Sequence, residues 1–250
     1  MYAALTENSA NLIKIPDYYF NTDASHMGIS LKTINNIQAR TLNHKFSDKY
    51  FIFGNRYLDT DETLFLKTTN IYNGATNSVD IGHSIDRIET IKNQVLVAGL
   101  TPDNNQGISL VPLNDLTNYQ QTTLYDRIEG ESRSHAFNYN YIDDFLVAGI
   151  TTYSKDILEY DDDEYWLDDV IPSDVTYVGG ENLEFDFIGD LKSKAEIIED
   201  CEISCEDWYG NSRPFFIGER IFALTGDELI EAGLLDGNII EITRINIGNQ

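Results

Sequence analysis

Cysteine is scarce in this chain of 250 residues, which contains only two. Cys201 and Cys205 have no histidine nearby, and two thiols are too few ligands for a closed zinc site. They either form a small disulfide loop in an oxidising compartment or stay as free thiols in a reducing one. The sequence thus argues against zinc here and leaves the redox state open.

Long apolar runs are also missing. No run approaches the roughly 18 residues of a membrane-spanning helix. The N-terminus shows no basic region followed by a long apolar stretch, so no signal peptide is visible. We therefore expect no membrane insertion, and either an intracellular protein or a trimmed piece of a longer one.

Basic residues are few, with 17 Lys and Arg against 42 Asp and Glu, which gives a formal net charge of −25. Such a surface repels the phosphates of nucleic acids and of anionic membranes, so neither is an expected partner. The excess of carboxylates is explained either by a solvated, soluble surface or by cation-binding clusters.

The common catalytic motifs are absent as well. The sequence contains no phosphate-binding P-loop, no Gly-x-Gly-x-x-Gly, no Gly-x-Ser-x-Gly elbow and no His-Glu-x-x-His. His26, His44 and His83 are scattered, at spacings that suit no pair of metal ligands. These absences disfavour an enzyme without excluding one, because an active site can be assembled from scattered loops.

What the chain does have is a repeated phrase. Val97-Ala-Gly-Leu-Thr101 returns fifty positions later as Val147-Ala-Gly-Ile-Thr151. A fainter copy lies at Phe51–Gly54, and Tyr2–Thr6 fits the same frame. Repetition at this spacing indicates one structural unit used several times. The small residue inside the phrase would let neighbouring backbones approach closely.

The segments around each phrase predict strands joined by turns rich in Asp, Asn and Gly. The clearest unit is the last, with four candidate strands at Pro214–Ile217, Arg220–Thr225, Glu228–Leu235 and Asn238–Ile247. Four short strands per repeat of about 40–50 residues are typical of a β-propeller blade. We therefore predict one all-β, propeller-like domain over residues 1–250, with about five repeats of four-stranded antiparallel blades.

Two features depart from this regular pattern. The first unit starts within the repeated strand, so the C-terminus closes the ring, the chain is a fragment, or a partner supplies a strand. Between the fourth and fifth units, the spacing stretches around residues 153–184. We interpret that stretch as an acidic loop inserted on one face of the domain.

Two stretches resemble a known family. They are Glu129–Tyr139, which continues into Asp143–Thr152, and the ending Arg213–Gly226. Both are similar to the C-terminal β-propeller domain of a group of prokaryotic secreted proteins. The resemblance covers about 40 of the 250 residues. It implies a propeller that is extracellular or associated with the cell surface, and it supplies no catalytic motif.

Ser132, Arg133, Ser134 and His135 form the most polar cluster between strand-like segments. They predict a ligand-binding patch on a rim or in a central channel, where His135 would be a base or a metal ligand. The alternative is that Arg133 and His135 make structural hydrogen bonds between blades. No catalytic residue is assigned.

The best metal candidate is the acidic run Asp161, Asp162, Asp163 and Glu164, with Asp168 and Asp169 close behind. Calcium requires several oxygen ligands at once, and these side chains supply them without matching an EF-hand. A solvated charged loop is the alternative. Calcium is the one cofactor that the sequence suggests.

Together these features favour a non-enzymatic binding or structural module that contacts a protein or carbohydrate partner at a cell surface. Two alternatives remain. One is a polysaccharide-acting enzyme with carboxylates lining a channel, which requires two of them facing each other at the separation that glycosidases use. The other is a surface-assembly subunit that pairs with further copies through an open sheet edge.

Overall fold

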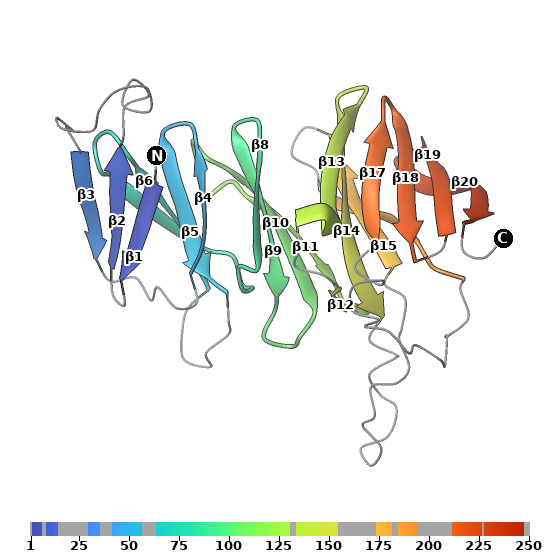
Figure 1. Cartoon of the computed structure of the whole chain (residues 1–250), viewed down its shortest axis with the longest axis horizontal. Coiled ribbons are helices and arrows are strands. Elements are labelled where there is room, and N and C mark those ends of the chain that lie inside the picture. The colour runs from blue at the N-terminus through green and yellow to red at the C-terminus, as the bar shows by residue number, and fades with distance from the viewer. Residues whose placement is uncertain are drawn as a thin grey trace, which may run out of the picture. The chain divides into compact units, whose positions relative to one another are not determined.

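The computed structural model describes residues 2–6, 9–14, 30–35, 42–56, 64–130, 134–154, 174–181, 185–194, 212–226 and 228–247. These residues form β-strands joined by turns, with one short 3₁₀ helix, η3 (Ser134–Ala136). Figure 1 shows the strands gathered into separate sheets. The chain divides into two compact units, Met1–Gly99 with Val111–Asn118 and Leu100–Leu110 with Tyr119–Gln250.

Two antiparallel sheets lie entirely within the first unit. The first has three strands, β1 (Tyr2–Thr6), β2 (Ser9–Lys14) and β3 (Ser30–Asn35). The second has four, β4 (Leu42–Ser47), β5 (Tyr50–Asn55), β6 (Phe65–Asn70) and β7 (Thr76–Asp80). Each sheet follows chain order, as in a propeller blade.

The third sheet also follows chain order. Its strands are β8 (Arg87–Ile91), β9 (Gln94–Leu100), β10 (Gln106–Pro112) and β11 (Gln120–Leu124). The repeated phrase thus occupies the second strand of this sheet, as its fainter copy does in the preceding sheet at β5.

Two sheets lie within the second unit. The fourth sheet contains β12 (Arg127–Glu129), β13 (Phe137–Ile142), β14 (Phe145–Ser154), β15 (Asp174–Gly180) and β16 (Asp186–Leu191), and both β12 and β13 pair with β14. The terminal sheet contains β17 (Arg213–Ile217), β18 (Arg220–Thr225), β19 (Glu228–Leu235) and β20 (Asn238–Asn246). The predicted all-β class with blade-like four-stranded antiparallel sheets is confirmed.

Turn chemistry explains where these strands end. Asp236 and Gly237 join β19 to β20 with φ angles of 50° and 76°. Leu235 and Asn238 are the paired residues that close this hairpin. Two consecutive positive φ angles define the type I′ turn, which an Asp-Gly pair adopts readily. The terminal hairpin is therefore fixed by its local sequence.

The glycines of the repeated phrase allow close packing, as expected. A Cβ atom built at Gly149 would lie 2.4 Å from Cβ of Pro214, which belongs to the terminal sheet. A Cβ atom at Gly99 would lie 2.0 Å from the backbone carbonyl oxygen of Ser84, and one at Gly54 would lie 2.9 Å from that of Phe65. Real Cβ atoms do not approach other atoms so closely, so these positions require glycine in the present packing.

The predicted acidic insertion around residues 153–184 differs from the structure at both ends. β14 continues to Ser154, and Asp174–Gly180 is β15, which pairs with β14 along its length. The interruption therefore falls inside the fourth sheet, between its strands β14 and β15. Val175–Gly179 is buried in this sheet, which is why an apolar stretch follows the acidic residues. In the part of the chain that the structure describes, no helix is long and apolar enough to cross a membrane.

Candidate functional site

The two faces of the terminal sheet differ in what covers them. The inner face buries Ile221, Ala223 and Ile230 against Val147 and Tyr177 of the fourth sheet. The hydroxyl of Tyr177 donates a hydrogen bond of 2.9 Å to the carbonyl oxygen of Phe222. Burial raises the pKa of this phenol, so the hydroxyl stays a donor at any ordinary pH.

The outer face of the same sheet exposes large aliphatic side chains. Among the residues whose burial is described, nine large hydrophobic side chains are exposed, and six of these lie in or beside the terminal sheet. They are Ile217 (58% exposed), Leu235 (62%), Ile240 (47%), Ile242 (65%), Ile245 (54%) and Ile247 (56%). We call this group the outer apolar face. Exposed apolar side chains gathered on one face are typical of an interaction surface.

Strand pairing places two of these side chains, Ile240 and Ile245, on one side of the sheet. Along β19, Ile230 and Ala232 are buried, whereas Leu229, Glu231 and Gly233 are only half-buried. On β20, Ile240 lies opposite Gly233 and Ile245 lies opposite Leu229. Directly paired residues share a face, so both isoleucines lie on the outer side.

The centre of the outer side carries an aromatic pair and an ion pair. The rings of Phe215 and Phe222 stack with centroids 5.1 Å apart and an interplanar angle of 8°. The guanidinium of Arg220 lies 4.9 Å from the centroid of Phe222 and donates two hydrogen bonds, of 2.7 and 2.8 Å, to Glu231. These hydrogen bonds lower the pKa of Glu231 and raise that of Arg220. The ring stack and the ion pair therefore position Phe215, Phe222, Arg220 and Glu231 relative to one another within the chain itself.

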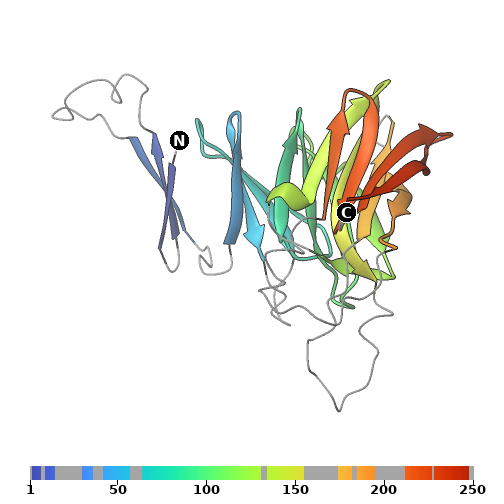
Figure 2. The same ribbon diagram turned by 45° about the vertical axis from the view of Figure 1, so that its right-hand side comes forward.

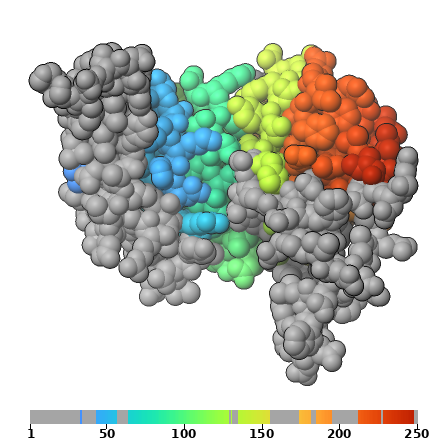
Figure 3. All heavy atoms as spheres, viewed as in Figure 1, coloured from blue at the N-terminus to red at the C-terminus, as the bar shows by residue number. Residues whose placement is uncertain are grey.

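β20 is the last strand of the terminal sheet in the strand order. In Figure 2, it lies in dark red at the end of the four orange and red strands. Figure 3 shows atoms of these strands on the molecular surface, in the same orange and red colours. The outer apolar face thus ends at a strand whose second edge pairs with no other described strand.

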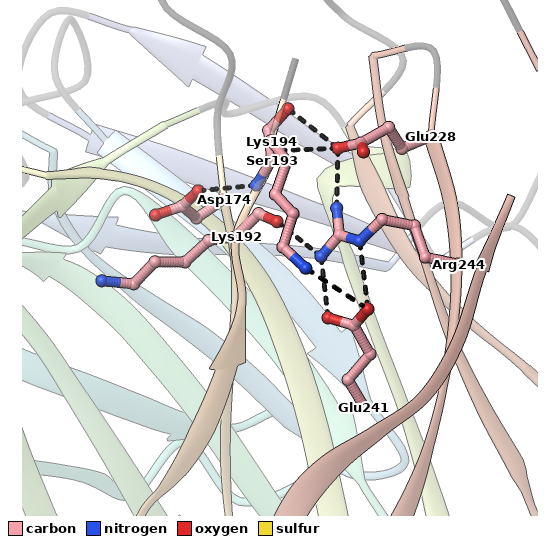
Figure 4. A network of polar contacts seen from close by, with 7 residues as sticks. All are labelled: Asp174, Lys192, Ser193, Lys194, Glu228, Glu241 and Arg244. Atoms are coloured by element: carbon pink, nitrogen blue, oxygen red, sulfur yellow. Dashed lines mark hydrogen bonds and ion pairs between the residues drawn. The ribbon is translucent and has the colours of Figure 1, made fainter. Parts of the chain in front are cut away.

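A network of ion pairs lies on the inner side of this sheet (Figure 4). Nη1 of Arg244 donates a hydrogen bond of 2.7 Å to Glu228, and Nη2 and Nε donate bonds of 2.8 and 3.1 Å to Glu241. Nη2 of Arg244 also donates to the carbonyl oxygen of Lys192 at 3.0 Å. Hydrogen bonding to Arg244 lowers the pKa of Glu241.

The same network continues into the fourth sheet. The backbone N–H of Lys194 donates a bond of 2.7 Å to Glu228, and the N–H of Ser193 donates one of 3.2 Å to Asp174. Arg127 contacts both Asp174 and Asp190. Burial raises the pKa of Asp174, and the nearby Arg127 opposes that rise.

The network is balanced in charge and satisfied in its hydrogen bonds. Four cationic and four anionic side chains take part: Arg127, Lys192, Lys194, Arg244, Asp174, Asp190, Glu228 and Glu241. Every carboxylate in it already contacts a cation. We interpret the network as a clamp that joins the fourth sheet to the terminal sheet.

The predicted ligand-binding cluster is only partly described. Ser132 and Arg133 lie outside the described residues. Ser134 begins η3, and the half-buried His135 follows it. η3 lies against β14 and β17. The binding role of Ser132, Arg133, Ser134 and His135 stays a prediction.

The predicted calcium ligands Asp161, Asp162, Asp163, Glu164, Asp168 and Asp169 all lie outside the described residues, as do Cys201 and Cys205. Within the described ranges, no group of three or more His, Cys, Asp or Glu residues is arranged to hold a metal ion. Calcium binding therefore stays a prediction.

Sequence reasoning missed the outer apolar face. The segment Asn238–Ile247 was predicted as a strand, but its five isoleucines exceed what one buried face of a strand needs. Successive residues of a strand point to opposite faces, so apolar side chains lie on both sides of the sheet when isoleucine occupies positions 239 and 240 and again 242, 245 and 247. A strand with two apolar faces at the end of the repeats was the available signal.

Comparisons with known proteins add little beyond the fold. No protein-family model matches the chain, and no curated protein sequence matches it. Among solved structures, an acylaminoacyl peptidase from Pyrococcus horikoshii matches 80% of this chain at 12% identity with a TM-score of 0.40, and the chain spans 32% of the peptidase. Kluyveromyces lactis Hsv2 matches 98% of this chain at 10% identity with a TM-score of 0.40, over 73% of its own length. The blade-like description rests on the strand order of the sheets themselves.

Proposed function

We propose that this chain is a non-enzymatic binding module that contacts a protein partner through its outer apolar face. One observation carries the proposal. The terminal sheet exposes six large aliphatic side chains in or beside its strands, while its inner face buries Ile221, Ala223 and Ile230 in the core. Burying such side chains is the main source of favourable free energy in protein association.

The chemistry of this face favours a protein over a carbohydrate. A sugar stacks on an exposed flat ring among polar groups, but Phe222 is only 6% exposed and Phe215 is half-buried, and the exposed large hydrophobic side chains of this face are isoleucine and leucine. Arg220, over the Phe222 ring, is the type of residue that anchors protein interfaces. The net charge of −25 favours a partner with a basic rim, because opposite charges speed encounter.

The cell-surface location implied by the family resemblance is part of this proposal. A polysaccharide-acting enzyme is the competing function. The balanced network around Arg244 supports the binding module over that enzyme, because its carboxylates are engaged by cations. An enzyme of this type would need an acid and a base that are free to act on the substrate.

The test is a selection of displayed random peptides on the purified protein. We expect enrichment of apolar sequences with basic flanks. Their binding should be lost in the double variant Ile217→Glu/Leu235→Glu, which places charge on the outer apolar face. The matched control is Tyr72→Glu, because Tyr72 is 70% exposed but belongs to the first unit. No enrichment, or peptides insensitive to the double variant, would refute the proposal.

A further inference from the structure

We propose that two copies of this chain associate by pairing their β20 strands antiparallel, so that the two terminal sheets join edge to edge. This inference goes beyond the proposed function because it uses the backbone edge of β20 rather than the outer apolar face. It rests on three observations: the second edge of β20 pairs with no described strand, the side chains of β20 are divided between the two faces of the sheet, and their order along the strand is self-complementary.

β20 is a long strand that ends the order of its sheet among the described strands. Eight of the nine residues in Asn238–Asn246 pair with β19 on one side, and no described strand pairs with the other side. Unpaired N–H and C=O groups along such an edge are a template for another strand. Lysine and proline, which commonly protect edge strands, are both absent from Asn238–Asn246, whereas two charged residues of opposite sign, Glu241 and Arg244, and a bulge at Ile242 are present.

The side chains of β20 divide between the two faces around an irregularity. The register shifts between Glu231 and Ala232 of β19, where Ile242 is the extra residue on β20. Before the shift Glu241 lies opposite the buried Ala232, and after it Arg244 lies opposite the buried Ile230. Glu241 and Arg244 therefore share the inner face, although an odd number of positions separates them.

This arrangement makes β20 complementary to itself. With a two-fold axis between Ile242 and Thr243, Ile240 lies opposite Ile245 of the second copy, and Glu241 lies opposite Arg244 of the second copy. Each pair joins residues of the same face, as antiparallel pairing requires. In a regular strand this register would join opposite faces, so the extra residue at Ile242 is what permits it.

Cross-strand pairs of this kind are favourable. The two isoleucine pairs are apolar, so they join like side chains. Glu241 and Arg244 already bond to each other within each chain, so across the axis they only avoid placing like charges opposite one another. A second copy therefore meets matched side chains at the edge, although each chain carries a net charge of −25. Salt screens repulsion between the rest of the two chains over about 8 Å at physiological ionic strength. We expect association to strengthen as salt is added.

One strand pair buries less surface than the roughly 1,200 Å² of a standard stable interface, so the dimer should be weak. Sedimentation equilibrium of the full chain at about 10 to 500 µM, in the range of weak complexes, should show a monomer–dimer equilibrium. Thr243→Lys places two lysines beside the two-fold axis and should weaken dimerisation at least about tenfold. Ile217→Lys is the matched control, since it adds the same charge to β17 of the same sheet.

Cross-linking tests the register itself. In a background with Cys201→Ser and Cys205→Ser, we would mix one chain carrying Ile240→Cys with another carrying Ile245→Cys. Disulfide formation should be much faster in the mixture than in either variant alone, because residue 240 lies opposite residue 245 of the second copy. This result supports the proposal even if Thr243→Lys fails to fold.

Three outcomes would overturn the inference. The chain could remain monomeric throughout the concentration range with no preferred cross-link in the mixture. Association could be abolished by Ile217→Lys and unaffected by Thr243→Lys, which would place the contact on the outer apolar face. Selected peptides could bind along β20 of a chain that stays monomeric, which would assign the edge to another protein. Failure of peptide selection alone would refute only the proposed function.

Discussion

The fourth sheet and the terminal sheet lie in the same unit and have similar strands, yet their coverage differs. In β14, seven consecutive residues from Leu146 to Thr152 are buried, and in β15 five consecutive residues are buried. In β19, buried residues alternate with half-buried ones, and most of β20 is exposed. Strands that are covered on both sides contribute to the hydrophobic core, whereas a sheet with one exposed apolar face can bind a partner protein there.

The largest expected effect comes from matched isoleucine variants on the two sides of the terminal sheet. Ile230 is fully buried on the inner face, and Ile240 is 47% exposed on the outer side. Ile230→Ala should lower the free energy of unfolding by about 4 kcal/mol through lost burial and a residual cavity. Ile240→Ala should change it by less than about 0.5 kcal/mol. Urea unfolding measures both, and equal effects would show that the outer side is covered.

The second prediction compares two arginines of the same sheet. Arg244 joins Glu228 in a largely buried pair, whereas Arg220 joins Glu231 at the surface. Arg244→Met should lower the free energy of unfolding by about 3 kcal/mol, because it leaves Glu228 buried without its partner. Arg220→Met should leave the urea midpoint almost unchanged, since exposed pairs contribute little. A harmless Arg244→Met would contradict a clamp between the sheets.

The third prediction tests the close approach of the two sheets. Gly149→Ala would place Cβ 2.4 Å from Cβ of Pro214, so the sheets must move apart. We expect a loss of about 2 to 3 kcal/mol in the free energy of unfolding, within the range for overpacked cores. Gly233→Ala is the control, because its nearest atom is the flexible end of the exposed Ile242, at 3.1 Å. The thermal midpoint of each variant decides whether β14 tolerates a side chain at this position.

The smallest prediction concerns His83, which is fully buried in the connection between β7 and β8. Burial lowers the pKa of His83 to about 4. The unfolded chain therefore takes up a proton below pH 6.5 while the folded chain does not, so stability falls as the pH drops from 6.5 toward 4. The loss at pH 5 should be about 2 kcal/mol.

The control for this effect is His83→Gln, which removes the titrating group. The difference in free energy of unfolding between the natural chain and this variant should change with pH between 6.5 and 4, and stay constant above 7. A constant difference throughout would mean that the pKa of His83 is the same in the folded and the unfolded chain.

Much of the strand pattern could be predicted from the sequence, because it depends on local signals. Arg220–Thr225 and Glu228–Leu235 were predicted with the bounds that the structure shows. The Asp236-Gly237 turn and the repeated glycines fix these elements through backbone conformation and contact distance. Such constraints are visible in a short stretch of residues.

The site could not be predicted in the same way, because it depends on contacts between distant residues. Arg127 meets Asp174 and Asp190 only when β12, β15 and β16 lie in one sheet. The openness of the outer apolar face depends on which surfaces are covered, and hydrophobic residues alone do not report that. The segment Asp174–Gly180 was expected in a loop because its acidic neighbours masked a short buried strand.

The neutral network at the inner side of the terminal sheet has a consequence for the rest of the chain. It uses four of the 17 basic side chains and four of the 42 acidic ones, which leaves 13 bases among 38 acids. The full net charge of −25 is therefore carried by the residues outside the network, which together behave as a polyanion, whereas the network itself is neutral. Self-repulsion in that remainder opposes compactness, and dissolved cations relieve it. The ionic strength of the surroundings thus acts on the two parts of the same polypeptide unequally.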